Sequence, residues 1–542
     1  MRQPYLPVTI CLSLVMASLT RPGMTDHIRD IQTTAVRSKT ADWGYWGSDA
    51  SQYSNWRNHS NRLIPVYTFG LSLDSVRGQA SPYRSVAKLK RLYGRVPEGT
   101  FNPDADYFDQ TDIYRLQQLA VSQGKKRIIL FIFDGMDWQT TRLASIVSSG
   151  RVAYRQGRGT GLAFQDYRGA ETDFGWFVTA PYSAGGKSDA TTQKFAAPGT
   201  SFGGYDSRIG GQFPWSQPLD AQYPMGTSRD RKHPYTDSAA SATAMTAGIK
   251  TINGAINVDP SGRPVEPIAR QLQRAGFSVG VVTAVPISHA TPASAYANNV
   301  TRADYQDLTR DLLGLPSVTH PVPLPGVDVL LGSGFGEIET ADSSQGNNFV
   351  PGNRYLTAAD LKQLRLKQNT CRVVLRTKSS SGRGILQQAV RNATQSRERL
   401  FGFFGVRGGH LPFQTADGKF DPTVGTPADS TEAETAAEVY SAADIAENPR
   451  LADMTLAALH VLSARSDRFW LMVEAGDVDW ANHKNNIDDS VGAVLSGTAA
   501  FTAACRWIES HDGWDETALI LTADHGHTLN LTRPEKLIIH RP

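Results

Sequence analysis

Five apolar runs stand out along the chain, and each is continuous rather than alternating with polar residues. Continuous runs of this length, rich in Val, Ile, Leu and Phe, are typical of strands that are buried on both faces of a parallel sheet. The runs predict strands within residues 128–133, 279–283, 327–335, 468–476 and 516–523.

Between these runs, apolar residues recur every three or four positions, which is the spacing of an amphipathic helix. The clearest examples are "TDIYRLQQLAVSQG", which ends in Gly124, and "NPRLADMTLAALHVLSA", while "TAADLKQLRL" predicts a helix within a polar insertion. Alternating strands and helices predict an α/β fold in which helices flank a central, mostly parallel sheet.

The segments outside this alternation define the expected domain organisation. Residues 1–24 hold one early charge, Arg2, and an apolar run from Val8 to Leu19 that is too short to span a bilayer. We interpret them as a signal peptide for export to the periplasm or the extracellular space, with no transmembrane segment after its removal. A buried N-terminal strand or helix is the alternative. A Trp- and Tyr-rich extension at residues 25–120 precedes the main domain at 121–542, with insertions at about 155–232 and 337–450.

Composition and charge narrow the range of functions, although they do not identify one. The 55 basic and 52 acidic residues give a net charge of +3, which provides no argument for a nucleic acid partner. A hydrophobic fraction of 40% and a charged fraction of 20% suit an enzyme with a large core. If the signal peptide is removed, Cys371 and Cys505 remain, and they could pair in an oxidising compartment if the fold brings them together.

Four of the predicted strands end in polar tips, namely "FDGMD", "SHATP", "EAGDVDWANH" and "TADHGH". Ligands of open α/β sheets bind outside the carboxyl ends of the strands, so the tips are expected to share one site. Their carboxylates, imidazoles and hydroxyls, without a thiolate, suit zinc together with magnesium at an all-oxygen position. Asp479 and His483 are four residues apart, and Asp524 and His525 are adjacent, so each pair can share an ion.

The stretch "HPYTDSAASATAMTAGIKTINGAI", residues 233–256, places Asp237 and Ser238 before a run of small residues. Small side chains let a backbone or a ligand approach closely. At the start of a helix, Ser238 would be either an N-cap or a nucleophile at the positive end of the helix dipole. The residue pattern by itself leaves both possibilities open.

This stretch resembles the nucleophile segment of the alkaline phosphatases, and "FDGM", "HATP", "VEAGDVDWANH" and "TADHGH" resemble four further blocks of that family in the same order. The similarity covers roughly residues 121–531. It implies a three-layer α/β fold with a catalytic domain at residues 121–542. It also implies hydrolysis of phosphate monoesters through a phosphoserine, at a site with two Zn²⁺ and one Mg²⁺, in a protein that forms a possible homodimer.

The resemblance implies a role for each matching residue. Ser238 corresponds to the serine that is phosphorylated and whose oxygen approaches the first zinc. The ligands that correspond to family ligands are Asp134, Asp524 and His525 for the zinc beside the serine, Asp479 and His483 for the second zinc, and Asp134, Thr291 and Glu474 for the magnesium.

The resemblance implies three further roles at the same site. Arg302 corresponds to the arginine that holds the phosphate oxygens, and Asp237 is expected to support both Arg302 and the start of the helix. His289 stands at a metal-site position where bacterial members often carry Asp and animal members carry His. His527 corresponds to a histidine that orients a zinc-binding carboxylate.

One departure from the family keeps alternatives open. The resemblance implies another block after "TADHGH", with a late histidine as the third protein ligand of the second zinc, but the chain ends at Pro542 without a matching block. We therefore expect the C-terminal end to be truncated. A catalytically impaired protein that binds phosphate or metal is one alternative, and a phosphodiesterase of the same superfamily is another. Single residues also have structural alternatives, such as a turn residue for Thr291 or a surface ion pair for Arg302.

Overall fold

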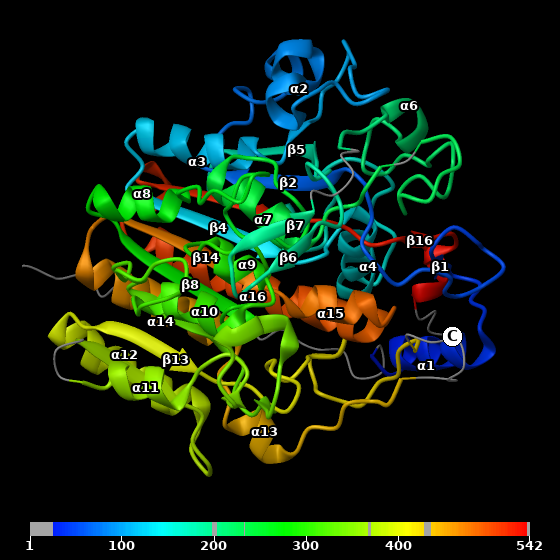
Figure 1. Ribbon diagram of the computed structural model, residues 1–542. Helices are drawn as coiled ribbons and strands as arrows, with labels where there is room; N and C mark the ends of the chain where they lie inside the picture. Colours follow the sequence, from blue (N-terminus) through cyan, green and yellow to red (C-terminus); the bar gives the residue numbers. More distant parts are fainter. Residues whose placement is uncertain (1–24, 198–202, 232, 367–369, 428–434, 539–542) are drawn as a thin grey trace, which may run out of the picture.

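A ten-stranded sheet forms the centre of the computed structural model, which describes residues 25–197, 203–231, 233–366, 370–427 and 435–538. The expected signal peptide therefore lies outside the described residues. In Figure 1 the sheet runs from β5 and β2 at the top, through β4, β14 and β8, to β13 at the bottom. In spatial order the strands are β12 (Cys371–Leu375), β13 (Arg399–Phe403), β9 (Val329–Ser333), β8 (Ser278–Pro286), β14 (Phe469–Ala475), β4 (Arg127–Phe133), β15 (Thr517–Thr522), β2 (Ile64–Phe69), β5 (Thr172–Val178) and β3 (Phe108–Asp109).

All strands of this sheet except β2 run in the same direction. Neighbours from β12 to β15 are parallel, β2 is antiparallel to both β15 and β5, and β3 is parallel to β5. In the centre, Trp470 of β14 lies opposite Ile128 of β4 and Val279 of β8. The predicted α/β fold with a mostly parallel sheet is confirmed, and the carboxyl ends of its central strands meet at one end of the sheet.

The five predicted apolar runs form β4, β8, β9, β14 and β15, and every residue of these strands is buried. Burial on both faces explains why their sequences do not alternate. The other five strands of the sheet come from segments that the sequence did not assign to it, and β3, β12 and β13 are three of them. The N-terminal segment supplies β2, and the segment at residues 155–232 supplies β5.

Helices cover both faces of the sheet, as two adjacent residues of β14 illustrate. The Trp470 indole donates a hydrogen bond of 2.8 Å to Gln117 of α3 (Asp112–Ser122). The next residue, Leu471, lies opposite Gly280, and a Cβ atom at Gly280 would meet Leu462 of α14 (Leu451–Arg465). Because successive residues of a strand point to opposite faces, α3 and α14 lie on opposite sides of the sheet.

The other helices extend these two layers and the loops around them. On the side of α3, α7 (Ser238–Ala247) packs against α3, α8 (Ile268–Arg274) and α9 (Ala290–Ser294) pack against α7, and α10 (Tyr305–Leu313) packs against α9. The helices that pack with α14 and its neighbours are α16 (Ile487–Glu509), α12 (Gly382–Ser396), α4 (Trp138–Ser149), α15 (Asp477–His483), α5 (Ala163–Asp166) and α1 (Thr25–Ser38). The helices of the loops are α2 (Val86–Tyr93), α6 (Ser207–Gly210), α11 (Ala358–Leu364) and α13 (Ala442–Ala446).

Three small antiparallel sheets lie outside the central one. They pair β1 (Gly44–Trp46) with β16 (Leu529–Leu531), β6 (Lys187–Asp189) with β7 (Lys194–Ala197), and β10 (Ile338–Glu339) with β11 (Gly352–Asn353). The pairing of β1 with β16 joins segments that are far apart in the sequence. The two cysteines of the described residues, Cys371 in β12 and Cys505 in α16, are both free.

Helix α16 is long and apolar enough to cross a membrane by length and composition. Within the fold, however, 61% of its most apolar stretch is buried, and it packs against α14, α15 and α4. Its apolar character is therefore accounted for by its place in the core.

Gly492 of α16 provides a test of this packing. A Cβ atom at residue 492 would lie 1.7 Å from the carbonyl oxygen of Gln414, and the hydrogen bond from Ala416 N to Asp488 Oδ1 holds that loop against the helix. Because backbone rather than a flexible side chain blocks the space, we expect Gly492→Ala to lower the free energy of unfolding by about 2–3 kcal/mol. Urea denaturation measures this change.

The half-buried Ser496, one turn further along α16, supplies the matched control. We expect Ser496→Ala to change the free energy of unfolding by less than about 0.5 kcal/mol. Equal effects of the two substitutions would contradict the close approach of the Gln414 backbone to the helix.

Candidate metal centre and active site

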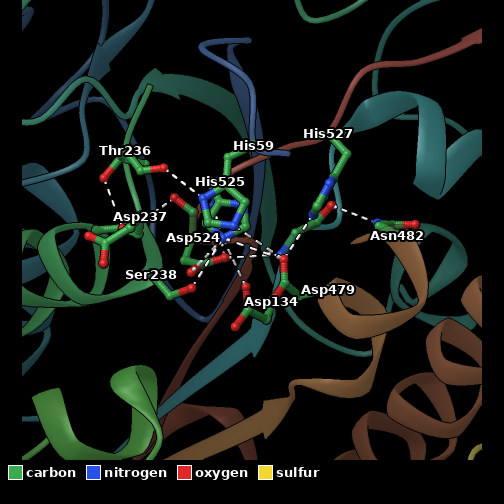
Figure 2. Close-up of polar contacts among 12 residues, drawn as sticks. His59, Asp134, Thr236, Asp237, Ser238, Asp479, Asn482, Asp524, His525 and His527 are labelled. Carbon is green, nitrogen blue, oxygen red and sulfur yellow. Dashed lines mark hydrogen bonds and ion pairs between the residues drawn. The ribbon is translucent and has the colours of Figure 1, made fainter. Parts of the chain in front are cut away.

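Four neighbouring strands, β8, β14, β4 and β15, end at a single site. Thr291 lies in α9 just after β8, Glu474 lies in β14, Asp134 follows β4, and Asp524 lies just beyond β15. Because these strands are parallel and adjacent, their carboxyl ends bring the four residues together. Figure 2 shows Asp134 and Asp524 pointing toward one another within this cluster.

Ser238 lies beside the first group of potential metal ligands, which consists of Asp134, Asp524 and His525. His525 Nε2 is 3.1 Å from Asp134 Oδ1, 3.4 Å from Asp524 Oδ2 and 3.2 Å from Ser238 Oγ. Ser238 is the first residue of α7, and the carboxylate of Asp237 caps this helix. The serine oxygen therefore lies at a helix N-terminus and faces buried carboxylates and an imidazole.

The carboxylates of this group are buried without enough partners of their own. Both oxygens of Asp134 and Oδ2 of Asp524 form no hydrogen bond. Burial, and then the nearby charge of Asp524, raises the pKa of Asp134 well above its usual range. Oxygens that are buried in this way are costly unless a cation neutralises them, so the residues fit a divalent metal ion.

A second set of oxygen donors lies next to Asp134. The Glu474 carboxyl accepts a hydrogen bond from the Thr283 hydroxyl, and Thr291 is fully buried beside it. Burial raises the pKa of Glu474 to about 8, although the two threonine hydroxyls oppose this shift. Carboxylate and hydroxyl oxygens without nitrogen ligands suit a hard cation such as Mg²⁺.

Asp479 and His483 lie one turn apart on α15, and His483 Nε2 is 3.4 Å from Asp479 Oδ1. His527 Nε2 contacts the same oxygen at 2.8 Å. Although burial opposes ionisation, the imidazoles of His483, His527 and His59 hold the pKa of Asp479 well below its usual range. Asp479 is therefore an ionised carboxylate that is surrounded by histidines.

His59 is the residue of this cluster that sequence reasoning missed. It belongs to a second group of potential metal ligands, together with Asp479, His525 and His527, and its side chain is buried. Its surroundings in the sequence, "NWRNHSNRL", contain no spacing typical of metal ligands. An isolated histidine in an aromatic and polar segment carries no signal that distinguishes a ligand from a packing residue.

Arg302 and His289 line the same pocket as Ser238. Arg302 Nη1 forms an ion pair of 3.1 Å with Asp237 Oδ2, so Asp237 supports both the helix and the arginine, as the sequence predicted. The His289 Nε2 atom is 3.4 Å from Arg302 Nη2, and its ring packs edge-on against Trp480. Burial, and then the charge of Arg302, lowers the pKa of His289 to about 3. His289 thus faces the arginine as a neutral imidazole.

A pocket of about 400 Å³ opens onto these residues. Its lining includes Ser238, Arg302, several histidines and Asp479, together with Trp480 and Lys484. A basic, partly aromatic pocket that leads to a serine and a cluster of potential metal ligands suits a small anionic substrate.

Fold and site together define an α/β protein with a carboxylate–imidazole metal centre beside a serine. The comparison with known families agrees with this class, because the family model described as alkaline phosphatase matches residues 216–537, more than half of the chain. The chain therefore belongs to the alkaline phosphatase family, and the family resemblance inferred from its motifs is confirmed.

Curated relatives carry the same family name. Alkaline phosphatase H of Pseudomonas aeruginosa (strain UCBPP-PA14) is 29% identical over 311 residues, which cover 55% of this chain and 59% of that protein. The repressible alkaline phosphatase of Saccharomyces cerevisiae (strain ATCC 204508 / S288c) is 30% identical over 319 residues, which cover 57% of this chain and 48% of that protein. The chain thus spans roughly half of the length of these relatives.

Among solved structures, this chain is similar to a cold-active alkaline phosphatase from a psychrophilic Shewanella species. The two are 20% identical, the TM-score is 0.43, and the alignment covers 74% of this chain and 68% of the other.

Crowding of unpartnered carboxylates leads to a prediction for the metal-free protein. At pH 8 in the presence of a chelator, we expect Asp134→Asn to raise the free energy of unfolding by roughly 1–3 kcal/mol, because it removes a buried charge that repels Asp524. The folded state raises the pKa of Asp134, so burial of this carboxyl destabilises the fold increasingly as the pH rises above the pKa of an aspartate in the unfolded chain. The destabilisation disappears below that pKa, where the carboxyl is protonated in both states. The gain should therefore shrink at lower pH.

Asp137, three residues further on, is the matched control. It is equally buried, and burial raises its pKa as well, but the pairing with Arg62 at 3.2 Å and the capping of α4 by its carboxylate oppose this shift. We expect Asp137→Asn to lower the free energy of unfolding by about 1–3 kcal/mol, because Arg62 loses its anionic partner. Urea denaturation of the chelator-treated proteins measures the free energy of unfolding of both variants. A loss of stability in both would contradict the argument that the carboxylates beside Asp134 repel one another.

Proposed function

We propose that this protein hydrolyses phosphate monoesters through a phosphoserine formed on Ser238. The observation that carries the proposal is the position of the Ser238 oxygen, 3.2 Å from His525 Nε2 and next to the unpartnered oxygens of Asp134 and Asp524. Family membership supports the reaction class, because the curated relatives are named alkaline phosphatases.

The donor atoms support two zinc ions and one magnesium ion. Asp134, Asp524 and His525 would hold one zinc, and Asp479 and His483 would contribute to the other, since these positions combine imidazole and carboxylate donors. The magnesium ligands would be Asp134, Thr291 and Glu474, which together offer oxygen donors alone. When bound, the ions supply positive charge that favours the ionised serine and stabilises the leaving oxygen.

The residues of the chain then carry out two displacements. The Ser238 oxygen bonds to phosphorus while the bond from phosphorus to the ester oxygen breaks, and the alcohol takes up a proton as it leaves. A water molecule next attacks the phosphoserine, the bond from phosphorus to the Ser238 oxygen breaks, and inorganic phosphate is released. The N-terminus of α7 favours the negative charge that approaches Ser238 in both steps.

Arg302 provides the main binding interaction with the phosphoryl group. Its guanidinium is oriented by Asp237 and borders the same pocket as Ser238. A planar guanidinium can donate two parallel hydrogen bonds to non-bridging phosphate oxygens, which fixes the phosphorus for in-line attack. His289, held neutral by burial and by Arg302, keeps this side of the pocket free of additional charge.

The apolar run at residues 8–19 supports export to the periplasm or the extracellular space. There the enzyme would hydrolyse phosphate monoesters that are present outside the cytoplasm. We also propose that the protein forms a homodimer, and this proposal rests on the family alone.

Replacement of the serine tests the proposal most directly. We expect Ser238→Ala to reduce p-nitrophenyl phosphate hydrolysis by a factor of roughly 10³ or more, because no oxygen remains to form the covalent intermediate. Acid quenching with radiolabelled phosphate should trap a phosphoprotein in the wild type and none in the variant.

Thr246→Ser, two turns further along α7, is the control, because it keeps a hydroxyl that bonds to Asn257 away from the pocket. We expect its rate to stay within about twofold of the wild type. A Ser238→Ala protein with unchanged turnover would refute the proposed nucleophile, and faster cleavage of bis(p-nitrophenyl) phosphate than of the monoester would favour a phosphodiesterase.

Arg302→Ala tests the binding of phosphate. Charged hydrogen bonds contribute about 1.5–3 kcal/mol each, so we expect inhibition by inorganic phosphate to weaken by roughly 10–100-fold. Asp237→Ala should also weaken inhibition by phosphate, but by a smaller factor, because the Arg302 guanidinium remains and only loses the partner that orients it. Arg263, which is exposed and pairs with Asp259, is the control, and Arg263→Ala should leave phosphate inhibition unchanged. Equal phosphate inhibition in wild type and Arg302→Ala would exclude the assigned role.

A further inference from the structure

We infer that His59 is a ligand of the second zinc ion, where it completes a set with Asp479 and His483. The inference rests on the proposed metal-dependent function, and it adds a residue that neither the motifs nor the family-matched region contains. The region matched by the family model begins at residue 216. His59 reaches the site from the N-terminal segment, as Figure 2 shows.

The three donor atoms have the spacing of a metal site. His59 Nε2 is 3.0 Å from His483 Nε2 and 3.6 Å from Asp479 Oδ1, and the latter two atoms are 3.4 Å apart. Zinc bonds to nitrogen and oxygen are about 2.0–2.2 Å long, so neighbouring ligands of a tetrahedral site lie roughly 3.3 Å from one another. The three atoms therefore form one face of a zinc-sized tetrahedron.

The hydrogen bonds of the two rings determine which nitrogens face each other. His59 Nδ1 lies 2.8 Å from the carbonyl oxygen of Thr236, and His483 Nδ1 lies 2.7 Å from the carbonyl oxygen of Arg57. A carbonyl oxygen accepts but never donates, so each Nδ1 carries the ring hydrogen, and each Nε2 of a neutral ring carries a lone pair. Two lone pairs facing each other at 3.0 Å repel unless a cation lies between them.

This arrangement is the usual one for histidines that bind metals. Such a histidine commonly donates its other ring N–H to a backbone carbonyl or carboxylate, which fixes the tautomer and the orientation of the ring. His59 and His483 both satisfy this condition through main-chain oxygens. Asp479 contributes the negative charge, and His527 contacts its Oδ1 at 2.8 Å.

The backbone around His59 is fastened to the loop that follows β15. Ser60 N donates to the carbonyl oxygen of Gly526 at 2.7 Å, and the Ser60 hydroxyl donates to the carbonyl oxygen of His527 at 3.1 Å. The Trp56 indole donates to the carbonyl oxygen of His59 at 3.1 Å. These bonds hold the ring in place with 6% of the residue exposed, so its position does not depend on a mobile side chain.

His59 also stacks on His525, a residue of the first ligand group. The ring centroids are 3.7 Å apart, and the planes differ by 20°. Two-metal hydrolytic sites separate their ions by roughly 3.5–4 Å, which is close to this stacking distance. Parallel rings that each offer one nitrogen to a different ion therefore match the spacing of a two-metal centre.

Metal binding measures the role of His59 without reference to turnover. Wild type, His59→Ala and His320→Ala would be stripped of metal and titrated with Zn²⁺ in a metal-buffered solution, and bound zinc would be counted by elemental analysis. His320 is the control, because this half-buried histidine pairs with Asp311 instead. We expect His59→Ala to bind one zinc fewer per chain, or to bind it with affinity reduced by more than the roughly 10–100-fold typical for loss of an outer partner.

Cobalt substitution supplies a spectroscopic readout of the same ligand. We expect the visible absorption of the Co²⁺ form of His59→Ala to lose intensity at one site, and His320→Ala to match the wild type. We expect added imidazole to restore the second metal ion to His59→Gly, because it can replace the missing ring. If His59→Ala does not fold, as judged by circular dichroism, His59→Gln is titrated in its place.

The outcomes separate this inference from the proposed function. Equal zinc stoichiometry and affinity in wild type and in the folded His59 variant would overturn the inference and leave the phosphatase proposal standing. A wild type that binds no zinc and forms no phosphoserine would overturn both.

Discussion

The structure depends on the burial of carboxylates and imidazoles that have no sufficient partners within the protein. Asp134, Glu474 and Asp524 lie in the core at the ends of neighbouring strands, where water cannot solvate them. Such a cluster is costly for a folded chain, because like charges repel in a medium of low polarity. Divalent cations, once bound, would convert the same cluster from a source of instability into a set of strong bonds. Stability and chemistry are thus linked through the same few oxygens.

The fold makes the crowding possible by placing rigid elements around it. The ladder between β14 and β4 fixes the distance between the strands that carry Glu474 and Asp134, and the start of α7 fixes Ser238. Asp237 contributes twice, as the cap of α7 and as the partner of Arg302. Ser238, the proposed nucleophile, and Arg302, the cationic group that would bind phosphate, are therefore positioned by one carboxylate. Their geometry is set before a substrate arrives.

Much of this architecture could be predicted from the sequence, because strongly buried strands and polar tips leave clear patterns. The apolar runs predicted β4, β8, β9, β14 and β15, and their tips contain Asp134, Glu474, Asp479 and Asp524. Strand β2 was not predicted, because the short segment "IPVYTF" contains a proline and lies among turn-forming residues. His59 was not predicted either, since its role arises from tertiary packing rather than from sequence spacing. Local patterns report local periodicity, and they say nothing about which distant loop closes a site.

The contacts of the segment from Trp56 to Ser60 have a consequence for the order of assembly during synthesis. This segment leaves the ribosome early, yet the carbonyl oxygens that hold Ser60 belong to Gly526 and His527, near the opposite end of the sequence. Strand β2 likewise gains one of its two neighbours when β15 appears. Contacts between such distant positions form late, because a long loop must close first. The nascent chain therefore carries an open, incomplete cluster for most of its translation. An ion that the completed cluster holds would therefore bind last, after these two distant segments have come together.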